Sequence, residues 1–119
     1  MNPDNHPSGG EALVEALKIH GTEVAFCVPG ESYLPVLDAL YGARESIRLI
    51  SCRQEGGAAT MAEAYGKLTG KPGVCFVTRG PGATNASIGV HTAFQTRTPF
   101  AAERKCVTAI KIIHMNISS

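Results

Sequence analysis

The amino-acid sequence predicts an α/β fold in which a parallel sheet carries helices on both faces. Three short apolar runs, at residues 24–28, 47–50 and 74–78, have the length and continuous hydrophobicity of strands that are buried on both sides. Segments whose apolar residues recur with helical spacing separate these runs. Because strands that alternate with helices pair in parallel through right-handed crossovers, we expect three layers: helices, sheet, helices.

Length and composition favour one domain without a charged macromolecular partner. The chain has 119 residues, of which 44% are hydrophobic, enough for one core. Its formal net charge is +1 and charges of both signs are interspersed, so we expect no nucleic-acid partner. The polar start resembles no signal peptide, and no apolar run approaches the roughly 20 residues of a membrane span. We therefore expect a cytoplasmic protein with no membrane partner.

The cysteines and histidines do not form a metal-binding pattern. Cys27, Cys52, Cys75 and Cys106 are widely spaced and include no Cys-x-x-Cys pair. The four histidines also lack the spacing of metal ligands. The cysteines are more typical of small buried hydrophobic residues in a reducing compartment, so no metal held by this chain is predicted.

Capping and turn residues place the first two helices. Ser8 and Glu11 have the spacing of a capping box, and Gly21 is a natural helix stop. After the first strand, Pro29-Gly30 predicts a turn, and helical spacing of apolar residues follows over residues 33–41. Each helix thus adjoins a buried strand, as the α/β pattern requires.

Two further helices flank the third strand. Apolar residues with helical spacing extend over residues 58–68, and the loop 80-GPGATN-85 leads into a last helix that ends near Phe94. The stretch GKLTGKPG at residues 66–73 resembles a P-loop superficially. It is one residue short, has Pro72 where a Ser or Thr must bind magnesium, and precedes a strand. A helix C-terminus with a glycine stop explains it better.

The segment after Pro99 does not continue the alternation. It contains a charged cluster and then an apolar run, residues 107–113, which Lys111 interrupts. Two interpretations stay open: an irregular edge strand that closes the sheet, and a frayed tail.

In a parallel sheet, ligands collect at the carboxyl ends of the strands. The loops at residues 28–31, 51–55 and 78–82 all follow strands, so they should face one edge. Glu55 is the notable residue because small residues, 56-GGAA-59, follow it and leave room for a close ligand. The plainer interpretation is a carboxylate at a helix N-terminus, paired with Arg53.

These segments together resemble a known family. The succession VAFCVPGE, RQEGGAATMAEAYGKLTGKPGV and FVTRGPGATNASIGVHTAF is similar to the N-terminal pyrimidine-binding domain of thiamine diphosphate enzymes of the acetolactate synthase and pyruvate oxidase group. The resemblance implies a flavodoxin-like sheet that is incomplete at its C-terminal part. It divides the chain into a polar tail at residues 1–8, a partial pyrimidine-binding domain at 9–99 and an atypical tail at 100–119.

The resemblance also implies a site. A glutamate at the position of Glu55 hydrogen-bonds the pyrimidine N1′ and activates the cofactor for attack on a 2-keto acid. Pro29, Gly30, Pro81 and Asn85 would line the pyrimidine pocket. Mg²⁺ and the diphosphate belong to a different domain, which another subunit supplies in the homo-oligomers of this family. This chain would therefore meet the pyrimidine end of thiamine diphosphate but bind no metal.

Several positions depart from the family. Gln54 stands where members commonly have His, and Thr96-Arg97 where an Asp-Ser pair is usual. The central domain and the Gly-Asp-Gly magnesium motif are not in this sequence. We expect a fragment that is inactive alone. The alternatives are a half-subunit that pairs with a separate diphosphate-binding chain, and a flavodoxin-like binding module that is not an enzyme.

Overall fold

A computed structural model describes residues 6–96 and 111–114. Its centre is a four-stranded sheet in which every neighbouring pair is parallel and the strand order is β2-β1-β3-β4. The strands are β1 (Val24–Cys27), β2 (Arg48–Ser51), β3 (Val74–Val77) and β4 (Lys111–His114).

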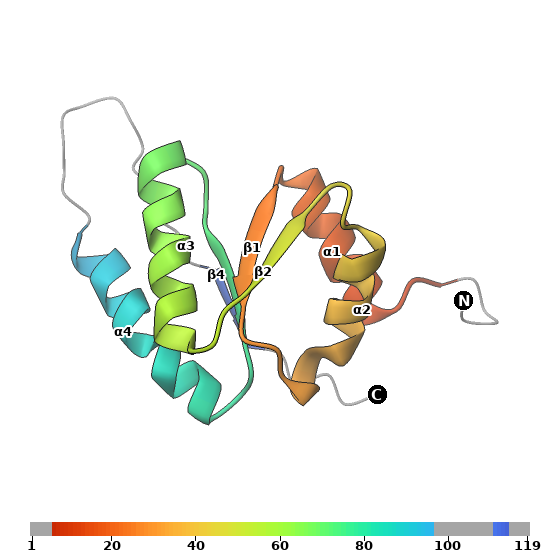
Figure 1. Ribbon diagram of the computed structural model, residues 1–119. Helices are drawn as coiled ribbons and strands as arrows, with labels where there is room; N and C mark the ends of the chain where they lie inside the picture. Colours follow the sequence, from red (N-terminus) through yellow and green to blue (C-terminus); the bar gives the residue numbers. More distant parts are fainter. Residues whose placement is uncertain (1–5, 97–110, 115–119) are drawn as a thin grey trace.

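Helices cover both faces of this sheet, as the sequence predicted. On one face lie α1 and α2, and on the other lie α3 and α4 (Figure 1). The helices are α1 (Gly9–Ile19), α2 (Leu34–Gly42), α3 (Glu55–Thr69) and α4 (Pro81–Gln95), with a 3₁₀ turn η1 (Glu31–Tyr33) before α2. The α/β class with a parallel sheet is therefore confirmed.

The helix ends follow from local chemistry. The Ser8 hydroxyl accepts from the Glu11 amide, and the Glu11 carboxylate accepts from the Ser8 amide, which is the predicted capping box. Gly70 ends α3 with φ of 70°, a left-handed conformation that favours glycine. Residues 66–73 are thus a helix end and its turn, which confirms that this segment is not a P-loop.

Alternation along the two central strands creates two cores. Ala25 and Cys27 of β1 face the layer of α1 and α2, whereas Phe26 between them faces α3 and α4. In β3, Val74 and Phe76 point to the first layer, and Cys75 and Val77 to the second. All four β3 side chains are buried, which explains the continuous apolar run in the sequence.

Three details differ from the sequence-based expectations. Helix α3 begins at Glu55, before the helical spacing of apolar residues that starts at residue 58, so Glu55 is a carboxylate at a helix N-terminus. The 3₁₀ turn η1 precedes the expected second helix, and β2 covers residues 48–51 instead of 47–50. Within the apolar run near the C-terminus, β4 pairs in parallel with β3, so this part forms an edge strand.

Cys27 and Cys75 are free and buried, as expected of small hydrophobic residues, while Cys52 is half-buried. Cys106 lies outside the described residues. Over residues 6–96 and 111–114, none of the helices combines the length and apolar character needed to cross a bilayer.

Candidate functional site

Three loops meet at the carboxyl edge of the sheet. The last residue of β1, Cys27, pairs with Ser51 at the end of β2 and with Phe76 in β3. The segments that follow these strands therefore leave the sheet side by side. This juxtaposition is the one that the parallel pattern predicted, and it places Glu55 beside the two other turns.

Glu55 is the first residue of α3 and is half-buried. The preceding residue, Gln54, caps the helix, because its side-chain oxygen accepts from the Gly57 amide at 2.9 Å. The partial positive charge of the helix N-terminus favours a carboxylate at this position. Among the described residues, Glu55 forms no ion pair with Arg53. The N-terminus of α3, and not an ion pair with Arg53, therefore stabilises the negative charge of Glu55.

Asn85 holds one oxygen of this carboxylate. Its side-chain amide donates to Oε2 of Glu55 at 3.2 Å, across 30 positions of sequence. Asn85 lies in the second turn of α4, which Gly80 and Pro81 begin. Gly80, the residue before α4, has φ of 64°, a conformation that favours glycine because a side chain would strain it. The Gly-Pro-Gly sequence thus places Asn85 against Glu55.

The other oxygen of Glu55 lies beside Gly82. A Cβ atom at this glycine would be 3.3 Å from Glu55 Oε1 and 2.8 Å from the methyl carbon of Thr78. Any larger residue would therefore push against both groups. The absence of a side chain at Gly82 thus allows the first turn of α4 to lie close to Oε1.

Tyr33 joins the turn after β1 to the sheet. The Tyr33 hydroxyl donates to the backbone oxygen of Val28, and the Tyr33 ring stacks on Phe76 with centroids 6.1 Å apart. Burial, followed by the nearby Cys27, Cys75 and Glu55, raises the pKa of Tyr33, so its proton stays in place at physiological pH. This turn is consequently fixed relative to the sheet.

The structure brings only some of the expected site residues into contact. Glu55 and Asn85 are in contact, and Gly30 packs near Thr78 at the same edge. Pro29 and Pro81 are exposed members of the flanking turns and take no part in the hydrogen bonds of this edge.

Sequence reasoning overlooked two residues at this edge, Ser32 and Thr78. Their hydroxyl oxygens are 2.8 Å apart and hydrogen-bonded, and Ser32 is only 7% exposed. The signal that could have revealed Thr78 is its position, since it directly follows a buried strand and precedes a glycine-rich turn.

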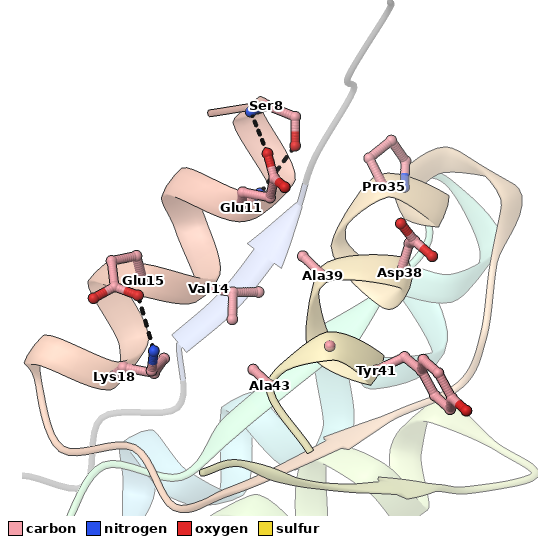
Figure 2. A pocket seen from close by; sticks show the side chains of 11 residues that line it. Ser8, Glu11, Val14, Glu15, Lys18, Pro35, Asp38, Ala39, Tyr41 and Ala43 are labelled. Atoms are coloured by element: carbon pink, nitrogen blue, oxygen red, sulfur yellow. Dashed lines mark hydrogen bonds and ion pairs between the residues drawn. The ribbon is translucent and has the colours of Figure 1, made fainter. Parts of the chain in front are cut away.

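A separate hollow of about 910 Å³ lies between α1 and α2, in the opposite layer (Figure 2). Of the four charged side chains that line it, Glu11 belongs to the capping box, Lys18 pairs with Glu15 at 3.0 Å, and Asp38 lies on α2. All four of these charged side chains are exposed, so none of them is desolvated. The hollow therefore shows no chemistry comparable to that at Glu55.

Residues 6–96 and 111–114 bring no three His, Cys, Asp or Glu side chains together in a way that could hold a metal ion. The side chains that hydrogen-bond between different loops at the carboxyl edge are instead Glu55 with Asn85 and Ser32 with Thr78. Such a set suits an uncharged or weakly basic ring with N–H groups better than it suits a cation.

Comparisons with known proteins identify the family. Residues 7–102 match the family described as "Thiamine pyrophosphate enzyme, N-terminal TPP binding domain". The chain is 42% identical over 97 residues to an acetolactate synthase of Arthrospira platensis and 41% identical over 95 residues to the acetolactate synthase isozyme 2 large subunit of Escherichia coli; each match covers 80% of this chain and 17% of the relative.

A third relative has a different name. It is a probable 2-ketoarginine decarboxylase of Pseudomonas aeruginosa, 38% identical over 99 residues, or 83% of this chain and 17% of that protein. The chain thus spans about a sixth of the length of these relatives. The family match over residues 7–102 and these relatives show that the chain belongs to the N-terminal TPP-binding domains of acetolactate synthase-like thiamine pyrophosphate enzymes.

Proposed function

We propose that this chain binds the aminopyrimidine ring of thiamine diphosphate and that Glu55 is the group that recognises ring nitrogen N1′. The observation that carries the proposal is the hydrogen bond from the Asn85 amide to Glu55 Oε2, which leaves Oε1 without a hydrogen-bond partner among the described residues. A carboxylate that is oriented by one donor and has no hydrogen bond at its other oxygen can accept a proton from a ring nitrogen or share one with it.

The residues around Glu55 fit a flat ring. The exposed Gly57 has nothing within 4 Å of the place where a Cβ would stand, whereas neighbouring protein atoms border the vacant side-chain positions of the buried Gly56 and Gly82. Close approach of a planar heterocycle to the N-terminus of α3 is therefore sterically possible. Gly30 and Pro29 would form the neighbouring wall, and Pro81 the rim at the start of α4.

When bound, thiamine diphosphate supplies the nucleophilic carbon that adds to the carbonyl of a 2-keto acid. In this proposal Glu55 holds the proton at N1′, Asn85 orients the carboxylate, and Gly57 leaves space for the ring beside the start of α3. The proposed substrates are 2-keto acids because the relatives are named as acetolactate synthases and a probable 2-ketoarginine decarboxylase.

The proposal assigns the diphosphate and Mg²⁺ to another chain or domain. In support, no three potential metal ligands gather within the described residues, and a hydrated diphosphate requires such partners to offset its desolvation. The chain would then be inactive alone and would complete its site against a diphosphate-binding domain, in a homo-oligomer or with a separate chain.

A titration of the ¹⁵N-labelled chain tests this assignment. Thiamine and thiamine diphosphate with Mg²⁺ should shift the same amide signals, those of Glu55, Gly56 and Gly82. Both should bind weakly, with Kd above roughly 1 mM, because half a site supplies only about 4 kcal/mol. Magnesium pyrophosphate alone should shift none of these signals. Micromolar binding that depends on magnesium would overturn the division of the cofactor between chains.

A further inference from the structure

Thr78 touches both glycine-containing turns of the site. It is half-buried and directly follows β3. A Cβ atom at Gly30 would be 2.7 Å from Thr78 Cβ, and a Cβ atom at Gly82 would be 2.8 Å from Thr78 Cγ2. One threonine therefore occupies the space between the turn after β1 and the first turn of α4.

The two branches of Thr78 point to different neighbours. Its hydroxyl oxygen is 2.8 Å from the hydroxyl oxygen of Ser32, whereas its methyl group faces Gly82. A β-branched side chain has a restricted χ1, so a bond to one branch also fixes the other. Because Ser32 is 7% exposed, loss of this bond would leave a largely desolvated hydroxyl without that partner.

This contact extends to Glu55. The vacant side-chain position of Gly82 is bordered by the Thr78 methyl group on one side and by Glu55 Oε1, at 3.3 Å, on the other. Gly82 and Asn85 lie in the first two turns of α4, and Asn85 holds Glu55 Oε2 at 3.2 Å. The position of the Thr78 methyl group thus sets where α4 begins relative to the carboxylate.

We infer that Thr78 is a positioning residue: its hydrogen bond to Ser32 and its methyl contact with Gly82 set the start of α4, and thereby the orientation of Glu55 by Asn85. This inference rests on the proposed function for its consequence, weaker binding of the aminopyrimidine. Its structural part, the effect on Asn85, can be measured without any ligand.

Two substitutions test the hydroxyl and the methyl group of Thr78 one at a time. Thr78→Val keeps the shape and removes the hydroxyl, and Thr78→Ser keeps the hydroxyl and removes the methyl group. Thr92→Val is the matched control, since Thr92 is also half-buried, lies on α4 and bonds through its hydroxyl to the Ile88 carbonyl oxygen at 2.9 Å.

The first measurement records the side-chain amide signals of Asn85 in the folded, ligand-free chain. Both Thr78 variants should move these signals toward the position of a solvent-exposed asparagine, and Thr92→Val should leave them in place. Unchanged Asn85 signals in both Thr78 variants, with or without a lower melting temperature, would overturn the inference and reduce Thr78 to a packing residue.

The second measurement is thiamine affinity. The Thr78 variants should bind at least about fivefold more weakly than the wild-type chain, the equivalent of about 1 kcal/mol, and Thr92→Val should bind equally well. Equal affinity in all three variants would contradict the inference. If the wild-type chain itself binds no thiamine, the proposed function fails, and the Asn85 signals still decide whether Thr78 positions α4.

A double substitution checks the methyl contact directly. Gly82→Ala should destabilise the wild-type chain because its new methyl group meets Thr78 Cγ2 at 2.8 Å. In combination with Thr78→Ser the destabilisation should be smaller, since the opposing methyl group is gone. Strictly additive effects would mean that the two side chains do not meet in solution.

Discussion

Asn85 Nδ2 donates a hydrogen bond to Glu55 Oε2 at 3.2 Å, and this contact joins the second turn of α4 to the first residue of α3. The two oxygens of the carboxylate are thereby made different. One accepts a hydrogen bond from an amide, and the other lies beside the vacant side-chain position of Gly82 and has no hydrogen-bond partner among the described residues. This asymmetry is the physical basis of the proposed recognition of a ring nitrogen.

Asn85→Ala should weaken thiamine binding without unfolding the chain. Asn85 is exposed, so removal of its amide leaves no buried polar group, and the free energy of unfolding should change by less than about 0.5 kcal/mol. Glu55 loses the donor that orients it, and affinity should fall by about fivefold or more. Titrations followed by NMR measure this. Ser87→Ala, an exposed change on the same helix, is the control; an equal loss there would refute the specific role of Asn85.

Glu63 should matter more for stability than an ordinary surface carboxylate. It is 5% exposed, pairs with Lys67 and accepts from the Thr96 hydroxyl at 3.1 Å, so it links α3 to the end of α4. Glu63→Gln keeps the size but removes the charge, and we expect a loss of about 1 to 3 kcal/mol in urea unfolding.

The comparison variant for Glu63 is Glu15→Gln. Glu15 pairs with Lys18 at 3.0 Å, but both side chains are well exposed, so the loss should stay below about 0.5 kcal/mol. Equal losses in the two variants would show that burial of Glu63 adds nothing to its ion pair.

Alkaline pH should destabilise the chain through Cys75. Burial, followed by the nearby Cys52, Cys27 and Glu55, raises the pKa of this thiol from 9.0 to about 12. Above pH 9 the unfolded chain releases the proton and the folded chain keeps it. The stabilisation is therefore complete below pH 9 and is lost as pH rises toward 12.

Between pH 8 and 10 this one group should remove about 1.4 kcal/mol from the free energy of unfolding. Urea unfolding at the two pH values, in the wild type and in Cys75→Ala, measures the difference. The variant should lose less stability over this interval than the wild type does. Parallel pH dependences would mean that the thiol is not desolvated.

Removal of residues 111–119 should lower stability. Strand β4 pairs with β3 from Val74 to Val77, and β3 is fully buried. Without β4, the backbone of β3 becomes an unpaired edge that can associate with other chains. We expect a melting temperature at least about 4 °C lower and more self-association in sedimentation experiments. Deletion of residues 115–119 alone is the control, and an equal effect there would argue against the role of β4.

Much of the fold was predictable because it rests on local signals. The capping box of Ser8 and Glu11, the glycine stop after α3 and the buried apolar strands each require only a few neighbouring residues. The start of α3 was harder to predict from the sequence, because Gln54 is not among the preferred N-cap residues and yet supplies the cap.

The site was predictable in part. Glu55 and Asn85 were expected at one edge, but their hydrogen bond depends on how α3 and α4 pack, which no local pattern encodes. Thr78 was overlooked for the same reason: its neighbours, Ser32 and Gly82, come from two different loops. Such contacts arise from tertiary packing, and a single sequence gives no periodicity that would mark them.

The most direct test of the account is the protonation of bound thiamine. Thiamine labelled with ¹⁵N at N1′ reports, through its chemical shift, whether this nitrogen carries or shares a proton. With the wild-type chain the bound N1′ signal should move toward that of the protonated ring, because the Glu55 carboxylate stabilises this form. In Glu55→Gln the ring should still bind, but the shift should be largely absent; Glu31→Gln, in the exposed neighbouring turn, should behave like the wild type. An N1′ shift of wild-type size in Glu55→Gln would contradict the central claim that Glu55 recognises the aminopyrimidine.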